Sequence, residues 1–61
     1  MMLEDFLGSI IRVDLLERSI PIYGRLIEVT PYWIIIERKN GSRRMISQGR
    51  ITGIECTEDL V

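Results

Sequence analysis

The stretch WIIIERKNGSRRMIS, residues 33–47, decides the fold. It opens with a dense apolar run over residues 33–36, which is typical of a strand covered on both faces. Asn40-Gly41 is the strongest short hairpin signal, because a type I′ turn needs positive φ at both central positions. A return strand is expected over residues 42–47. The stretch therefore predicts a β-hairpin.

Working outward, the segments on either side of this hairpin also show strand periodicity. Residues 9–16 alternate, and their apolar side chains share one face. A second alternating segment, residues 20–26, carries Gly24 in its interior, where a glycine suggests a sharp bend or a close backbone approach. A last strand is expected over residues 51–56, after the tight connection Gln48-Gly49-Arg50. These patterns predict five strands.

The start of the chain has a different period. Its apolar residues at positions 3, 6 and 7 are at helical spacing, and Gly8 follows where a helix would stop. The expected fold class is therefore mostly β: a short N-terminal helix followed by a strongly bent five-stranded antiparallel barrel. One domain over residues 1–61 is all that this length can hold.

A chain of 61 residues buries a small core, so it needs a further source of stability. Cys56 is the only cysteine and there is no histidine, so neither an internal disulfide nor an ordinary zinc site is expected. No cofactor, metal or catalytic residue is predicted, because there is no histidine for general-base work and no phosphate-binding loop. Association with partner subunits remains, and we expect a homo-oligomer.

The charge of the chain is unevenly distributed. The net charge is −1, yet residues 38–54 contain five basic residues and no acid. Such a segment is either a solvated hairpin or a phosphate-binding surface. No apolar run is long enough to span a membrane, and residues 1–6 hold two acids and no base, unlike a secretory signal. These features predict a cytoplasmic protein.

Four short motifs resemble the Sm-like family, which includes bacterial Hfq and the archaeal and eukaryotic Lsm proteins. They are GSIIRVDL (residues 8–15), IYGRL (22–26), TPYWIII (30–36) and ISQGRI (46–51). The second and fourth are similar to the centres of the two Sm motifs. The resemblance covers nearly the whole chain, with departures in residues and in spacing. Thr30 stands at the family's aspartate, Ile34 at its asparagine, and Gln48 at a basic residue. The last turn is shorter than in most Sm proteins, and one extra residue lies between Leu15 and Gly24.

The resemblance implies a ring of six or seven subunits in which strand four of one copy pairs with strand five of the next. It also implies a single-stranded RNA site in which Tyr32 stacks on a base and the last turn lies beside it. The candidate RNA-binding residues are Tyr32, Gln48, Arg50, Arg38, Lys39, Arg43 and Arg44.

Two functions from different classes stay open. The first is a ring that binds single-stranded, uridine-rich RNA without catalysis, favoured by Tyr32 and the basic hairpin. The second is a protein-interaction or scaffold module on the same barrel that has lost RNA binding, favoured by Thr30, Ile34 and the acidic pI of about 5.3. An unrelated SH3-like barrel acting as a monomer or dimer is a third possibility for the fold.

Overall fold

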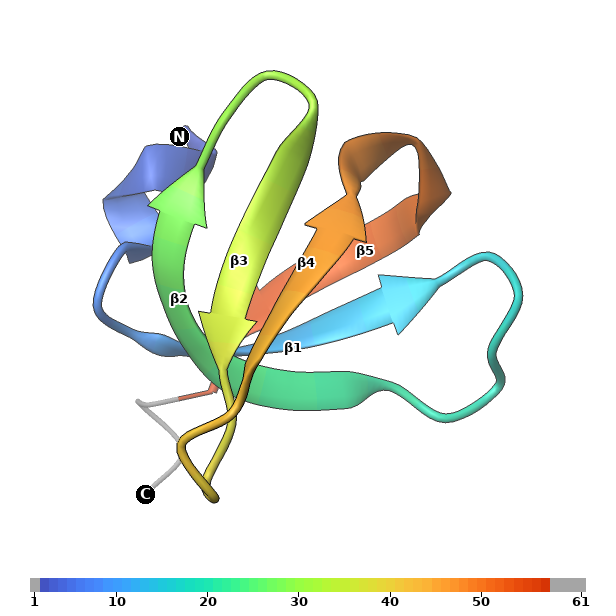
Figure 1. Ribbon diagram of the computed structural model, residues 1–61. Helices are drawn as coiled ribbons and strands as arrows, with labels where there is room; N and C mark the ends of the chain where they lie inside the picture. Colours follow the sequence, from blue (N-terminus) through green and yellow to red (C-terminus); the bar gives the residue numbers. More distant parts are fainter. Residues whose placement is uncertain (1, 58–61) are drawn as a thin grey trace.

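The computed structural model describes residues 2–57, which form one antiparallel sheet and two short 3-10 turns (Figure 1). The elements in chain order are η1 (Leu3–Phe6), β1 (Ile10–Leu15), β2 (Ile22–Val29), β3 (Trp33–Glu37), β4 (Arg43–Ser47), η2 (Gln48–Arg50) and β5 (Ile51–Cys56). The mostly β fold class and the five strands predicted from the sequence are confirmed.

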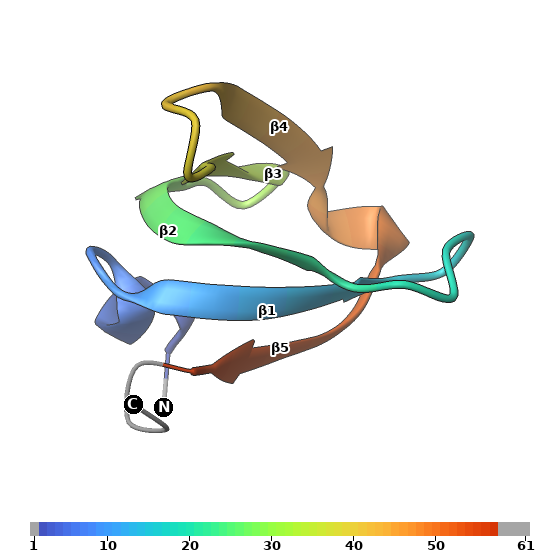
Figure 2. The same ribbon diagram turned by 90° about the horizontal axis from the view of Figure 1, so that it is seen from below.

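The central strand β2 organises the sheet, whose strand order is β4-β3-β2-β1-β5. The first half of β2 pairs with β1, from Ile22 to Arg25, and its second half pairs with β3, from Arg25 to Val29. Because the two partners take different halves, β2 bends between them, and the sheet curves around its inner face (Figure 2). An extra residue between Leu26 and Glu28 adds a bulge just after the bend.

Gly24 makes the bend possible. A Cβ atom at this position would lie 2.9 Å from the Glu37 carbonyl oxygen and 3.2 Å from the Cβ of buried Ile36. Only a residue without a side chain lets β3 pass this close to β2. The close approach that the sequence suggested at Gly24 is therefore present.

The core lies on the inner face of the curved sheet and is entirely aliphatic. Alternate residues of each strand supply it, as expected for a period of two. No polar or charged side chain in residues 2–57 is buried. The eight buried side chains are Ile11, Val13, Leu15, Ile22, Leu26, Ile34, Ile36 and Ile46.

The sheet is not closed into a barrel, and this part of the prediction was wrong. Within residues 2–57, β4 pairs only with β3 and β5 only with β1, so both are edge strands. The short connection η2 is bonded to both sides, since Gln48 N donates to Tyr32 O before β3 and Arg50 O accepts from Leu16 N after β1, and beyond it each edge strand stays with its own partner. Figure 2 shows η2 bridging the two edges at one end, from which β4 and β5 diverge.

The N-terminal helix is also shorter than predicted. It is a four-residue 3-10 turn, closed by the bonds from Asp5 N to Met2 O and from Leu7 N to Glu4 O. The Asp5 carboxylate accepts a further bond from Met2 N at 3.0 Å. A run of this length is too short to nucleate a stable α-helix, and i→i+3 bonding is the usual alternative.

The Asn40-Gly41 hairpin forms with a different turn from the predicted type I′. Gly41 N donates to Arg38 O and Arg38 N to Ser42 O, which leaves a loop of residues 39–41. Gly41 has φ of +86°, and no non-glycine residue in the described chain has positive φ. This is the pattern of a three-residue hairpin loop with its glycine in the left-handed region.

Replacing Gly24 by alanine should destabilise the fold by about 1–3 kcal/mol, because the new methyl group would press on the β3 backbone and on buried Ile36. Urea unfolding followed by circular dichroism measures this. Gly49→Ala is the matched control, since its Cβ would meet nothing closer than Ser47 Oγ at 3.9 Å. Equal losses in the two variants would contradict the close approach as the cause.

Candidate nucleic-acid interface

The loop between β2 and β3, residues 30–32, is held by the hydroxyl of Thr30. Thr30 Oγ1 accepts hydrogen bonds from Tyr32 N at 3.1 Å and from Trp33 N at 3.0 Å. Thr30 N donates to Trp33 O at 2.9 Å, which closes the turn. This loop, called the Thr30 loop below, therefore has a defined conformation built on a neutral oxygen acceptor.

Tyr32 projects from the Thr30 loop with 74% of its surface exposed. Its only ring neighbour in the described chain is Trp33, at a centroid distance of 6.4 Å and an interplanar angle of 34°. The Trp33 indole is half-buried and donates to Glu28 Oε2 at 3.2 Å. Tyr32 is thus outside the core, and its ring is free to stack on a flat partner.

Gln48 lies directly against the Thr30 loop. Its backbone N donates to Tyr32 O at 2.9 Å and its side-chain Nε2 to Thr30 O at 2.5 Å. The structure therefore brings Gln48 and Tyr32 together, as the family resemblance implies. One donor of the side-chain amide is already used, so Gln48 braces the loop that carries Tyr32.

Arg50 is held by a different part of the chain. Its Nε donates to Glu17 Oε1 at 2.8 Å and its second guanidinium nitrogen to Glu17 Oε2 at 3.0 Å. This two-point pairing fits a guanidinium to a carboxylate and neutralises both charges. Glu17 belongs to the connection between β1 and β2, so Arg50 is directed to that connection.

The four remaining candidates surround the β3–β4 hairpin and form what we call the hairpin cluster: Arg38, Lys39, Arg43 and Arg44. They lie at the opposite end of β3 and β4 from Tyr32 (Figure 1), about 16 Å away for a five-residue strand. Arg43 faces Glu37, with its Nε 3.8 Å from Glu37 Oε2. Arg44 pairs with Ile36, so it leaves the sheet on the opposite face from Arg43.

The candidate residues therefore separate into three groups: Tyr32 with Gln48, Arg50 with Glu17, and the hairpin cluster. The sequence alone did not single out Glu17, because its contact with Arg50 spans 33 positions. It also did not select Tyr23, which faces away from the core in β2 and lines a pocket beside the hairpin. The alternation of residues 22–26 places Tyr23 on the face opposite the core, and this pattern could have indicated an exposed aromatic ring.

Neither a metal site nor a membrane-spanning helix is found in the part of the chain that the structure describes. Within residues 2–57, no three His, Cys, Asp or Glu side chains converge as a metal site would require. Among the same residues, no helix has the length and hydropathy needed to cross a bilayer. Comparison of the chain with protein families, curated proteins and solved structures found no match.

Two substitutions at Thr30 test whether its hydroxyl holds the Thr30 loop. Thr30→Val keeps the shape of the side chain but removes the acceptor for Tyr32 N and Trp33 N, so we expect a loss of about 1–2 kcal/mol. Thr30→Ser keeps the oxygen and should stay close to the original stability. Chemical unfolding monitored by Trp33 fluorescence gives both values, and a valine variant as stable as the serine variant would show that the hydroxyl does not hold the loop.

Proposed function

We propose that this chain is a non-catalytic, Sm-like protein that assembles into a ring and binds single-stranded, uridine-rich RNA in the cytoplasm. The observation that carries the proposal is the pair of free edges, β4 and β5, at the two ends of one curved sheet. These are the two strands through which the family resemblance implies that neighbouring copies pair.

The free edge of β4 offers a regular row of backbone groups. Arg38 N donates to Ser42 O at one end of the strand, and Gln48 N donates to Tyr32 O beyond the other end. Because hydrogen-bonded and non-hydrogen-bonded pairs alternate in an antiparallel ladder, residues 43, 45 and 47 direct their N–H and C=O groups away from β3.

The free edge of β5 is complementary. Thr57 N donates to Ile10 O, and the same alternation directs the backbone groups of Ile54 and Cys56 away from β1. Unpaired strand edges favour pairing with another chain. Because the two edges differ and lie at opposite ends of the sheet, pairing β4 of one copy with β5 of the next is heterologous, and it gives a ring when the rotation closes.

Assembly would also multiply the RNA contact. Trp33 pairs with Ser47 at the end of β4, so the Thr30 loop lies next to the proposed subunit contact. Each copy then contributes one exposed Tyr32 ring, and successive bases of one strand can stack on successive copies. Linked contacts of this kind raise the overall affinity well above that of one site.

A second function, a scaffold that binds protein rather than RNA, is favoured by the charge pairing. Arg50 is engaged by Glu17 and Arg43 by Glu37, and one donor of Gln48 is taken by Thr30. Three of the seven candidate RNA-binding residues therefore have partners within the chain. The scaffold uses the same ring and the same edges, so RNA affinity separates the two functions.

Met45→Pro tests the assembly. Proline removes the outward N–H of Met45 and leaves the ladder to β3 intact, so it should weaken edge pairing while the fold is kept. We expect the wild-type chain to sediment as a ring of six or seven copies and the proline variant to sediment as smaller species.

Met45→Ala is the matched control, because it removes the same exposed side chain and keeps the N–H. It should assemble like the wild type if backbone pairing is the main contact. This pair of variants is more specific than charged substitutions at Ile51 or Ile54, which pack against the core. A wild-type chain that sediments as a folded monomer at micromolar concentration would rule out the ring.

Tyr32→Ala tests the RNA site. Loss of the stacking ring should weaken binding to oligo-uridine by about 1–3 kcal/mol per occupied site, whereas Tyr32→Phe should bind almost normally. Since the ring is largely exposed, the melting temperature of the alanine variant should stay close to that of the wild type.

Filter binding and thermal unfolding on the same samples provide the two readouts. Oligo-uridine binding that is absent at low salt, in wild-type protein that forms the ring, would reject the RNA function and favour the scaffold. Equal RNA affinity of the alanine and phenylalanine variants would remove Tyr32 from the site.

A further inference from the structure

A pocket of about 340 Å³ lies on the outer face of the sheet, beside the bend of β2. One wall comes from β1 and β2, and the other comes from the end of β3 and the hairpin loop. The lining residues are Ile10, Tyr23, Gly24, Arg25, Glu37, Arg38 and Lys39. We call this the bend pocket, and its size is within the range of small-ligand sites.

The bend pocket exists because of Gly24. The close approach of the Glu37 carbonyl to Gly24 brings the hairpin loop up against β2. None of the lining residues belongs to β4 or β5, so edge pairing would leave the pocket open. It lies at the hairpin end of β3, away from Tyr32, and is a separate site.

The floor of the bend pocket offers an apolar, flat surface. Tyr23 is 52% exposed and Ile10 37% exposed, although both sit on strands. They occupy the outer face, where Ile10 pairs with Arg25 and Tyr23 with Arg12. A half-exposed tyrosine ring beside an aliphatic side chain is a suitable platform for a planar group.

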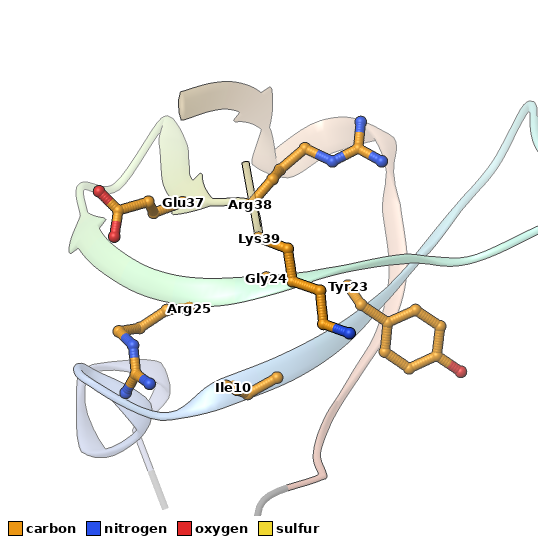
Figure 3. Close-up of a pocket in the computed structure, with 7 residues that line it drawn as sticks. All are labelled: Ile10, Tyr23, Gly24, Arg25, Glu37, Arg38 and Lys39. Atoms are coloured by element: carbon orange, nitrogen blue, oxygen red, sulfur yellow. The ribbon is translucent and has the colours of Figure 1, made fainter. Parts of the chain in front are cut away.

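The charged groups around this floor are predominantly positive. Neither Arg38 nor Lys39 has an ion pair within the part of the chain that the structure describes. Glu37, the single carboxylate of the lining, has the Arg43 guanidinium 3.8 Å away. In Figure 3 Lys39 reaches across β2 toward the side on which Tyr23 lies, and Arg38 extends away from the floor.

These features describe a ligand with two parts. It has a planar ring for Tyr23 and an anionic group for Lys39, because these two side chains lie on the same side of the pocket, whereas the Glu37 carboxylate points to the opposite side (Figure 3). A nucleotide has both parts in its base and phosphate. An acidic peptide offers the anion without the ring.

We propose that the bend pocket binds a nucleotide unit, with its base against Tyr23 and its phosphate on Lys39. The unit comes from a free mononucleotide or from one residue of a single-stranded RNA. Only the second source rests on the function proposed above, and it would give each copy a second RNA contact besides Tyr32.

Titration of the full chain with uridine 5′-monophosphate, followed by amide NMR shifts, tests the pocket. Shifts should concentrate at Ile10, at residues 23–25 and at residues 37–39. Uridine, which lacks the phosphate, should bind about tenfold or more weakly, because a hydrogen bond to a charged group is lost. Absence of shifts at these residues up to millimolar nucleotide would overturn the proposal, as would equal affinity for uridine.

Paired variants assign the contacts. Lys39→Gln should weaken nucleotide binding about tenfold, whereas Arg18→Gln, the same charge change at an exposed residue outside the pocket, should leave it unchanged. Tyr23→Phe should retain binding and Tyr23→Leu should lose about fivefold or more. Equal effects of Lys39→Gln and Arg18→Gln would show that the nucleotide is held by general charge attraction, which would refute the site. Tighter binding of an acidic peptide than of the nucleotide would also refute it.

Competition with oligo-uridine separates the two sources and the two proposals. Displacement of the mononucleotide by oligo-uridine supports RNA as the source, and its absence supports a free nucleotide. If Tyr32→Ala abolishes oligo-uridine binding while Lys39→Gln and Tyr23→Leu bind every ligand normally, the RNA function stands and the bend pocket falls. If only the pocket variants lose mononucleotide binding and the wild-type protein binds no RNA, the bend pocket stands and the RNA function falls.

Discussion

The contact on which the rest of this structure depends is the approach of the Glu37 carbonyl and Ile36 to Gly24. It lets β2 give one half to β1 and the other half to β3, so that five short strands curve around a single inner face. The aliphatic core follows from that curvature, because alternate residues of every strand then converge. On the outer face the same approach creates the bend pocket. One missing side chain therefore shapes both faces of the sheet.

Much of the fold could be predicted because the strands show a local period of two in the sequence. The alternation around Ile11 and Val13 marked a strand with one buried face, and the glycine within the next strand marked the bend. Barrel closure could not be predicted in this way, since it depends on how η2 joins the two edges through bonds to Tyr32 and Leu16. The turn at Asn40-Gly41 likewise depends on the register of the strands that it connects.

The candidate site shows the same difference between local and long-range features. The exposure of Tyr32 follows from a local turn, so the sequence was informative about it. The partner of Arg50 lies in a distant loop, which no local pattern reveals. Exposed ion pairs such as this one contribute at most about 1 kcal/mol to stability. Their effect is on the surface potential. Among residues 2–57, Arg38, Lys39 and Arg44 around the hairpin make no ion pair, and neither does Arg18 in the connection between β1 and β2.

The hydroxyl of Thr30 has a consequence for the conditions under which the Thr30 loop keeps its shape. The resemblance places an aspartate at this position, and an ordinary aspartate becomes protonated below about pH 4. A threonine hydroxyl does not titrate, so the bonds that it accepts from Tyr32 N and Trp33 N are independent of acidity. The neutral acceptor adds no charge of its own to the loop, and the carboxylate of Glu28 accepts from the neighbouring Trp33 indole. The loop thus combines a fixed geometry with a support whose charge does not change with acidity.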